Sequence, residues 1–159
     1  MPALYIAQEE AGMINDEAIA WVSENLDMPA VQIREVATFY TMYYKNPVGK
    51  YHFQVCRTLS CAINGSKALM EHLEKRFNIN PHEVTKCGKF SFEPVECLGS
   101  CGTAPMCEIN DRYFENLTPE KLEAIIKRIE EEEPDLRLST KKDKLGDGLK
   151  EYPSSSVRS

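Results

Sequence analysis

The stretch YHFQVCRTLSC, residues 51–61, joins a strand-like pattern to a pair of cysteines. Its first five residues alternate apolar and polar side chains, and this period of two predicts a half-buried β-strand that ends at Cys56. In such a strand His52 lies on the exposed face. A loop of four residues then leads to Cys61. We therefore expect two thiols to lie close together at one end of a sheet.

A second pair of cysteines follows the same plan. The stretch FSFEPVECLGSC, residues 90–101, begins with a strand pattern, places Cys97 near its end, and reaches Cys101 after three more residues. Gly99 and Gly102 bracket Cys101. Glycines allow a loop to turn its backbone N–H groups toward negatively charged sulfur. The two loops could therefore present two sulfurs each to one shared metal group.

Two pairs of thiolates suit an iron–sulfur cluster or a structural zinc ion. Zinc sites commonly use Cys-x2-Cys pairs, and neither pair has that spacing, which favours iron–sulfur. The ligand run of plant-type ferredoxins and the paired histidines of Rieske centres do not occur in the sequence. A thiol oxidoreductase would need a reactive Cys-x2-Cys motif, which the sequence also lacks. Spacing alone leaves buried thiols without a metal as a further alternative.

The chain has six cysteines, so the residues alone leave the choice of four ligands open. Cys107 lies in an apolar strand pattern and is expected to be a small core residue. Cys87 lies between a lysine and a glycine and is expected to be a loop or surface thiol.

The three histidines are not expected to bind metal because none is spaced from another as paired ligands are. His72 is predicted on a helix surface and His82 in a loop, while His52 belongs to the strand described above.

Composition limits the class of protein. A chain of 159 residues with 42% hydrophobic residues can build one modest core and an appendage. Its net charge of −6 argues against nucleic-acid binding. The first residues do not resemble a signal peptide, and no apolar run approaches the roughly 20 residues that span a bilayer. We therefore expect a soluble protein in a reducing compartment, where cysteines serve as ligands more often than as disulfides.

Residues 1–48 are predicted to form an N-terminal helical region. Asn15 or Asp16 can cap one helix, and Pro29 suits the first turn of another. The apolar positions of these two helices recur at helical spacing: Ile19, Val22 and Leu26 in the first, and Val31, Val36, Phe39 and Tyr40 in the second. The aromatic group of Phe39, Tyr40, Tyr43 and Tyr44 is expected to contribute to the core and to an interface.

Residues 49–133 are predicted to form the main domain. Its order is a strand, a helix ending near Phe77, a second strand, a hairpin around Asn110, and a closing helix capped by Thr118. This α/β (α+β) order resembles the minimal thioredoxin-like layout. Residues 134–159 lose periodicity and are expected to form a tail that is flexible or ordered by a partner.

Four blocks of the sequence resemble a known family over about residues 13–130. They are EVATFYTMY (35–43), CRTLSC (56–61), VECLGSCGTAPMCEIND (95–111) and YFENLTPEKL (113–122). Together they are similar to the small [2Fe–2S] subunit of NADH:quinone oxidoreductase, respiratory complex I. The block at 95–111 departs from the family at Gly102 and Thr103, which concerns the surroundings of the cluster and not its ligands.

The resemblance implies a thioredoxin-like [2Fe–2S] ferredoxin domain preceded by a small helical bundle. It implies that one [2Fe–2S] cluster is bound by the family's ligand positions, which here are Cys56, Cys61, Cys97 and Cys101. It also implies docking on a flavoprotein subunit that binds NADH and FMN, so that this chain carries electrons without catalytic residues of its own. The whole complex would lie peripherally on the inner, cytoplasmic face of a membrane, without insertion of this chain.

Two alternatives remain open at this stage. Related subunits serve NAD-linked hydrogenases and formate dehydrogenases, and sequence does not separate these hosts. A zinc-stabilised interaction module is the alternative from a different class.

Overall fold

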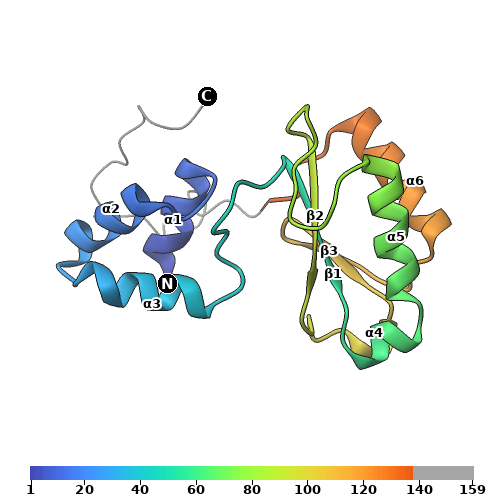
Figure 1. Cartoon of the computed structure of the whole chain (residues 1–159), viewed down its shortest axis with the longest axis horizontal. Helices are drawn as coiled ribbons and strands as arrows, with labels where there is room; N and C mark the ends of the chain where they lie inside the picture. The colour runs from blue at the N-terminus through green and yellow to red at the C-terminus, as the bar shows by residue number, and fades with distance from the viewer. Residues whose placement is uncertain (138–159) are drawn as a thin grey trace. The chain divides into compact units, whose positions relative to one another are not determined.

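The computed structural model describes residues 1–137, which divide into two compact units (Figure 1). The first unit is Met1–Pro47, and the second comprises residues 48–137. Most of the predicted tail, residues 138–159, lies outside the described residues.

The first unit consists of three helices, α1 (Pro2–Ala11), α2 (Asp16–Leu26) and α3 (Ala30–Phe39). The cap predicted for α2 is present, because the Asn15 side chain accepts a hydrogen bond from the Ala18 N–H at 2.8 Å. Helix α1 was not among the two helices predicted for this region. Its buried face is made largely of alanines, which give no apolar stripe in the sequence.

The apolar pattern predicted for α3 marks the packed side of that helix only in part, since Val36 packs against the helical core but other members do not. Ile33 and Ala37 are buried, whereas Val31 is 61% exposed and Phe39 is 79% exposed. The helix carries apolar residues on more than one side, so periodicity alone does not decide which side packs. Among the nearby aromatic residues, Tyr43 is buried and its hydroxyl donates to the Met1 carbonyl at 3.2 Å.

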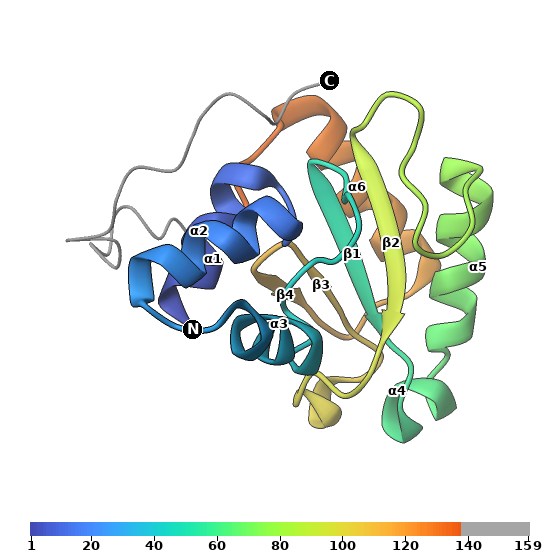
Figure 2. The ribbon, with the colours of Figure 1, turned by 60° about the vertical axis from the view of Figure 1, so that its left-hand side comes forward.

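The second unit is built on a four-stranded sheet in the order β2-β1-β3-β4. Its strands are β1 (Tyr51–Cys56), β2 (Phe90–Val95), β3 (Cys107–Ile109) and β4 (Arg112–Phe114). Strands β1 and β2 are parallel, and the other two pairings are antiparallel. The connection from β1 to β2 contains helices α4 (Leu59–Ile63) and α5 (Ser66–Phe77). Figure 2 shows this crossover beside the sheet.

Helices α5 and α6 (Pro119–Glu132) cover one face of the sheet (Figure 1). Phe53 lies at the centre of this layer with no exposed surface. Its ring centroid is 5.6 Å from that of Phe77 and 6.2 Å from that of Phe90. Helix α6 starts as predicted, with the Thr118 side chain accepting from the Lys121 N–H. These contacts make one continuous core that fixes β1.

The chain beyond α6 begins with residues that pack on the same unit. The Tyr51 hydroxyl donates to the Pro134 carbonyl at 3.0 Å, and the Asp111 N–H donates to the Leu136 carbonyl at 3.2 Å. Leu136 also packs against the core of the sheet unit. The first residues of the predicted tail, Pro134 and Leu136, therefore contact the sheet unit.

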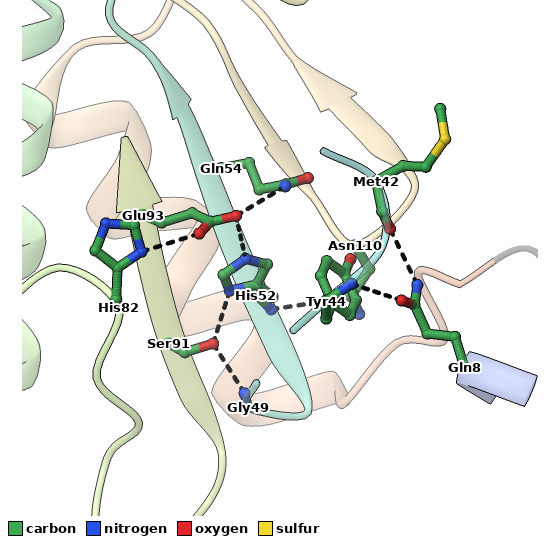
Figure 3. Close-up of polar contacts among 10 residues, drawn as sticks. All are labelled: Gln8, Met42, Tyr44, Gly49, His52, Gln54, His82, Ser91, Glu93 and Asn110. Atoms are coloured by element: carbon green, nitrogen blue, oxygen red, sulfur yellow. Dashed lines mark hydrogen bonds and ion pairs between the residues drawn. The ribbon is translucent and has the colours of Figure 1, made fainter. Parts of the chain in front are cut away.

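His52 is buried, and its predicted place on an exposed strand face is wrong. All six residues of β1 are buried, and only 2% of His52 is exposed. Its Nδ1 lies 2.8 Å from the Ser91 Oγ, and its Nε2 lies 3.1 Å from the Glu93 Oε1 (Figure 3). Buried polar groups need such partners, so the alternating pattern of β1 here marks a polar network and not a solvated face.

Glu93 is the centre of this network, and its pKa predicts an acid-dependent stability. Burial raises the pKa of Glu93, but hydrogen bonds with His52, Gln54 and His82 outweigh burial and lower it to about 2. A carboxylate with a depressed pKa stabilises the fold above its unfolded-state pKa of 4.5 and loses that contribution as pH falls through about 2. The contribution is roughly 3 kcal/mol.

We expect Glu93→Gln to be less stable than the parent near neutral pH, and the gap to close as pH falls from about 4.5 to about 2. Urea unfolding at several pH values measures the difference in free energy of unfolding between the two proteins. Loss of a cofactor in acid would affect both proteins and so would not produce this difference. The exposed Glu131→Gln is the matched control and should behave like the parent. A gap that stays constant down to the lowest pH would contradict the role of this charge.

Candidate metal centre

The two cysteine loops start from the same edge of the sheet. Because β1 and β2 are parallel and Cys56 is opposite Val95, the two strands end side by side. Cys97 follows two residues after Val95. Cys61 is carried by α4, a helix of five residues where the sequence pattern predicts a loop. Cys101 opens the 3-10 turn η1 (Cys101–Thr103). The topology therefore brings the two distant segments together.

Within the site the cysteines form two pairs of different exposure. Cys56 and Cys61 are each only 2% exposed, and they belong to one buried cluster with Met106. Cys97 and Cys101 are exposed, and their Sγ atoms are 3.5 Å apart. Cys97 is the main cause of the raised pKa of Cys101, and Cys56 adds to it, so the two pairs lie close enough to interact. One side of the candidate site is thus buried and the other reaches the surface.

In each pair the first thiol ionises more easily than the second. Burial raises the pKa of Cys56, but hydrogen bonds from the Thr58 hydroxyl and from backbone N–H groups outweigh it and lower the pKa. Burial and then the hydrogen bond with Cys56 raise the pKa of Cys61 to about 11. The Gly99 N–H, 3.4 Å from Sγ, lowers the pKa of Cys97, whereas the neighbouring Cys97 raises that of Cys101.

Backbone N–H groups from several segments favour negative charge on the sulfurs. The Gly99 N–H donates to the Cys97 Sγ at 3.4 Å. The backbone N–H groups of Thr58 and Leu98 lower the pKa of Cys56, and that of Met106 opposes the rise in the pKa of Cys61. Met106 itself is fully buried against the inner pair. Donors of this kind stabilise thiolate charge without adding a competing cation. The arrangement fits a group that needs several negative sulfur ligands.

The pairing suits a cluster of two irons. Across residues 1–137, no three His, Cys, Asp or Glu side chains converge as ligands of a single metal ion would. A [2Fe–2S] cluster makes a different demand, because each of its irons takes two protein sulfurs. The buried pair and the surface pair could each serve one iron. The donor set and the N–H groups around it therefore fit a [2Fe–2S] cluster.

Comparison with known proteins identifies the family. A family model described as thioredoxin-like [2Fe-2S] ferredoxin matches residues 1–130. The chain belongs to the thioredoxin-like [2Fe-2S] ferredoxin family. This membership confirms the fold class predicted from the sequence and the expectation of one [2Fe–2S] cluster.

Curated proteins similar to this chain are matched over most of its length. An NADH-quinone oxidoreductase subunit of Rickettsia bellii is 47% identical over 130 residues, which is 81% of this chain and 78% of the relative. The corresponding NADH-quinone oxidoreductase subunit of Rhizobium meliloti is 40% identical over 126 residues, covering 79% of this chain and 75% of the relative. The predicted resemblance to the complex I subunit is confirmed.

A solved structure shares the fold of this thioredoxin-like ferredoxin. A chain of NAD+-reducing [NiFe]-hydrogenase in the air-oxidized state matches with a TM-score of 0.71 at 24% identity. The match covers 87% of the present chain but 24% of the hydrogenase chain. At this identity the comparison establishes the fold.

The cysteines outside the two pairs lie where the sequence pattern predicts them. Cys107, on β3 of the ferredoxin sheet, is fully buried in the core. Cys87 is exposed, and its Sγ lies 3.4 Å from the Thr85 Oγ1.

His72 lies on helix α5, where the sequence predicts it, and its Nε2 is 3.0 Å from the Glu123 Oε2. No described helix is both long enough and apolar enough to cross a bilayer.

Proposed function

We propose that this chain is the electron-carrying subunit of a respiratory NADH dehydrogenase, with its [2Fe–2S] cluster bound by Cys56, Cys61, Cys97 and Cys101. The observation that carries the proposal is the meeting of two distant cysteine pairs at one edge of the sheet. There the Gly99 N–H donates to Cys97, and backbone N–H groups lower the pKa of Cys56. Curated relatives at 40–47% identity, named as subunits of NADH-quinone oxidoreductase, support the choice of complex.

The chain's own residues would bind and position the cluster. Four thiolates would hold the irons, and the N–H groups would offset the negative charge that accumulates on sulfur. Buried Met106 would keep water from the inner pair, while the outer pair would remain near the surface. When bound, the cluster supplies one-electron transfer. The surface pair offers a short path for an electron between the cluster and a neighbouring protein.

The proposed neighbour is the flavoprotein subunit that binds NADH and FMN. A hydride carries two electrons, and a flavin can accept it and release electrons singly, so the two-electron chemistry would belong to that partner. This chain then needs no acid, base or nucleophile of its own. The assembly would lie peripherally on the inner face of the membrane, as part of a larger complex.

Isolation of the native complex tests this proposal. We expect the chain to co-purify with an FMN-containing subunit, and NADH to reduce a [2Fe–2S] centre that EPR assigns to this chain. Co-purification with a hydrogenase or a formate dehydrogenase would refute the choice of host. Isolation without any flavoprotein would refute the proposed partnership.

A further inference from the structure

The loop that carries the outer cysteines is held from the side by strand β4. Alternate residues of a strand point to the same face, so Tyr113 and Glu115 share one side of the chain at and just beyond the end of β4. The Tyr113 hydroxyl donates to the Leu98 carbonyl at 2.9 Å. Leu98 directly follows Cys97. One end of the cysteine loop is thereby fixed.

Glu115 holds the other end of that loop, around Cys101. The hydroxyls of Ser100 and Thr103 both donate to its Oε1, the second at 2.6 Å. These two residues lie on either side of Cys101 and Gly102, and their hydroxyl oxygens are 2.7 Å apart. One carboxylate oxygen therefore closes the turn in which Cys101 sits.

The segment that carries Glu115 is itself anchored. The Asn116 N–H donates to the Thr103 carbonyl at 2.8 Å, and the Leu117 N–H donates to the Pro105 carbonyl at 2.9 Å. Leu117 is buried in the core of the sheet unit. These contacts hold the backbone that carries the Glu115 carboxylate close to the cysteine loop.

The charge of Glu115 is not cancelled by the groups that bind it. Both donors are neutral hydroxyls, in contrast to Glu96 near Cys97, which is paired with the Arg57 guanidinium at 2.6 Å. A [2Fe–2S] cluster with four thiolates is negatively charged and gains one more negative charge on reduction. A carboxylate beside it disfavours the reduced form more than the oxidised form.

We propose that Glu115 is the positioning residue of the Cys101 turn and that its negative charge lowers the reduction potential of the cluster. This inference rests on the proposed function, because it assumes that Cys101 is a ligand. Because Glu115 is exposed to solvent, screening by water and salt reduces the effect of its charge on the reduction potential. The test therefore depends on the direction in which the potential changes.

Three variants of the cluster-loaded chain test the inference by EPR-monitored redox titration. Glu115→Gln keeps an oxygen acceptor and removes the charge, so we expect a full cluster with a more positive midpoint potential. Glu115→Asp keeps the charge, so its potential should stay closer to that of the parent. Glu131→Gln removes an equal charge on α6, near the end of the helix opposite to the cysteine loops, and should leave the potential unchanged (Figure 1).

A fourth variant separates positioning from charge. Glu115→Ala removes the acceptor for both hydroxyls, and we expect it to lose iron faster than Glu115→Gln under a chelator. Equal rates would overturn the positioning role, and a potential unchanged in a loaded Glu115→Gln would overturn the charge effect. If Glu115→Gln loads no cluster while Glu115→Asp loads fully, an acceptor oxygen without the charge does not hold the turn, and the positioning role as stated is overturned. A parent chain without iron would overturn the proposed function instead, which keeps the two failures distinct.

Discussion

Replacing Cys61 by serine is expected to reduce the iron content of the purified chain by more than half. The serine hydroxyl is a poorer ligand than a thiolate because it stays protonated and lacks a soft, polarisable sulfur. Cys61 lies in the buried half of the site, with 2% of its surface exposed, so water or a neighbouring side chain cannot easily replace it. Cys56→Ser should behave in the same way. Iron analysis and visible absorption measure the loss.

Cys87→Ser is the matched control for this series. It makes the same chemical change at an exposed cysteine outside the two pairs, and it should retain the full cluster and an unchanged EPR spectrum. Serine at Cys97 or Cys101 should weaken or alter the cluster, because the proposal assigns a ligand to each. A fully loaded and spectroscopically unchanged cluster in any of the four ligand variants would show that the ligand set is wrong.

Phe53→Ala is expected to destabilise the sheet unit by about 3–5 kcal/mol, the usual cost of removing a buried phenylalanine. Phe53 has no exposed surface and packs edge-on against Phe77 at 5.6 Å. Because β1 also ends in Cys56, the loss of this ring should loosen the strand that delivers the inner cysteine pair. Urea unfolding followed by far-ultraviolet circular dichroism measures the change in free energy.

Phe39→Ala provides the comparison within the same chain. The substitution is identical, but Phe39 is 79% exposed, so its effect on stability should lie within about 0.5 kcal/mol. Similar losses for the two variants would mean that burial does not explain the importance of Phe53.

Much of the sheet unit was predictable because strand period and turn residues agree along that part of the sequence. The extent of β1, the cap at Thr118 and the core position of Cys107 are all found in the structure. Helix α4 was not predictable in the same way, since five residues are too few to show a helical period. The two cysteine loops were recognisable, but the parallel pairing that joins them was not.

Two errors have a common physical cause. An alternating pattern implies one solvated face only if that face is uncovered, and His52 is instead buried in a hydrogen-bonded network. In α3, apolar residues on several sides left the packed side undetermined, and Phe39, one member of the predicted apolar pattern, is exposed. In both cases tertiary contacts, which the local sequence does not contain, decide the environment of the side chain.

Glu115 illustrates a site residue that no sequence pattern pointed to. It belongs to the block YFENLTPEKL, but as an exposed glutamate it has no feature that separates it from other surface charges. Only the fold places it against both residues that flank the Cys101–Gly102 step. Its position two residues after Tyr113, on the same side of the chain, was the available signal.

Metal and sulfide analysis combined with EPR of the purified chain is the most direct test of the central claim. We predict two irons and two acid-labile sulfides per chain, and a single rhombic signal from one unpaired electron that appears on anaerobic reduction. A colourless native protein that contains zinc and no iron would contradict the account.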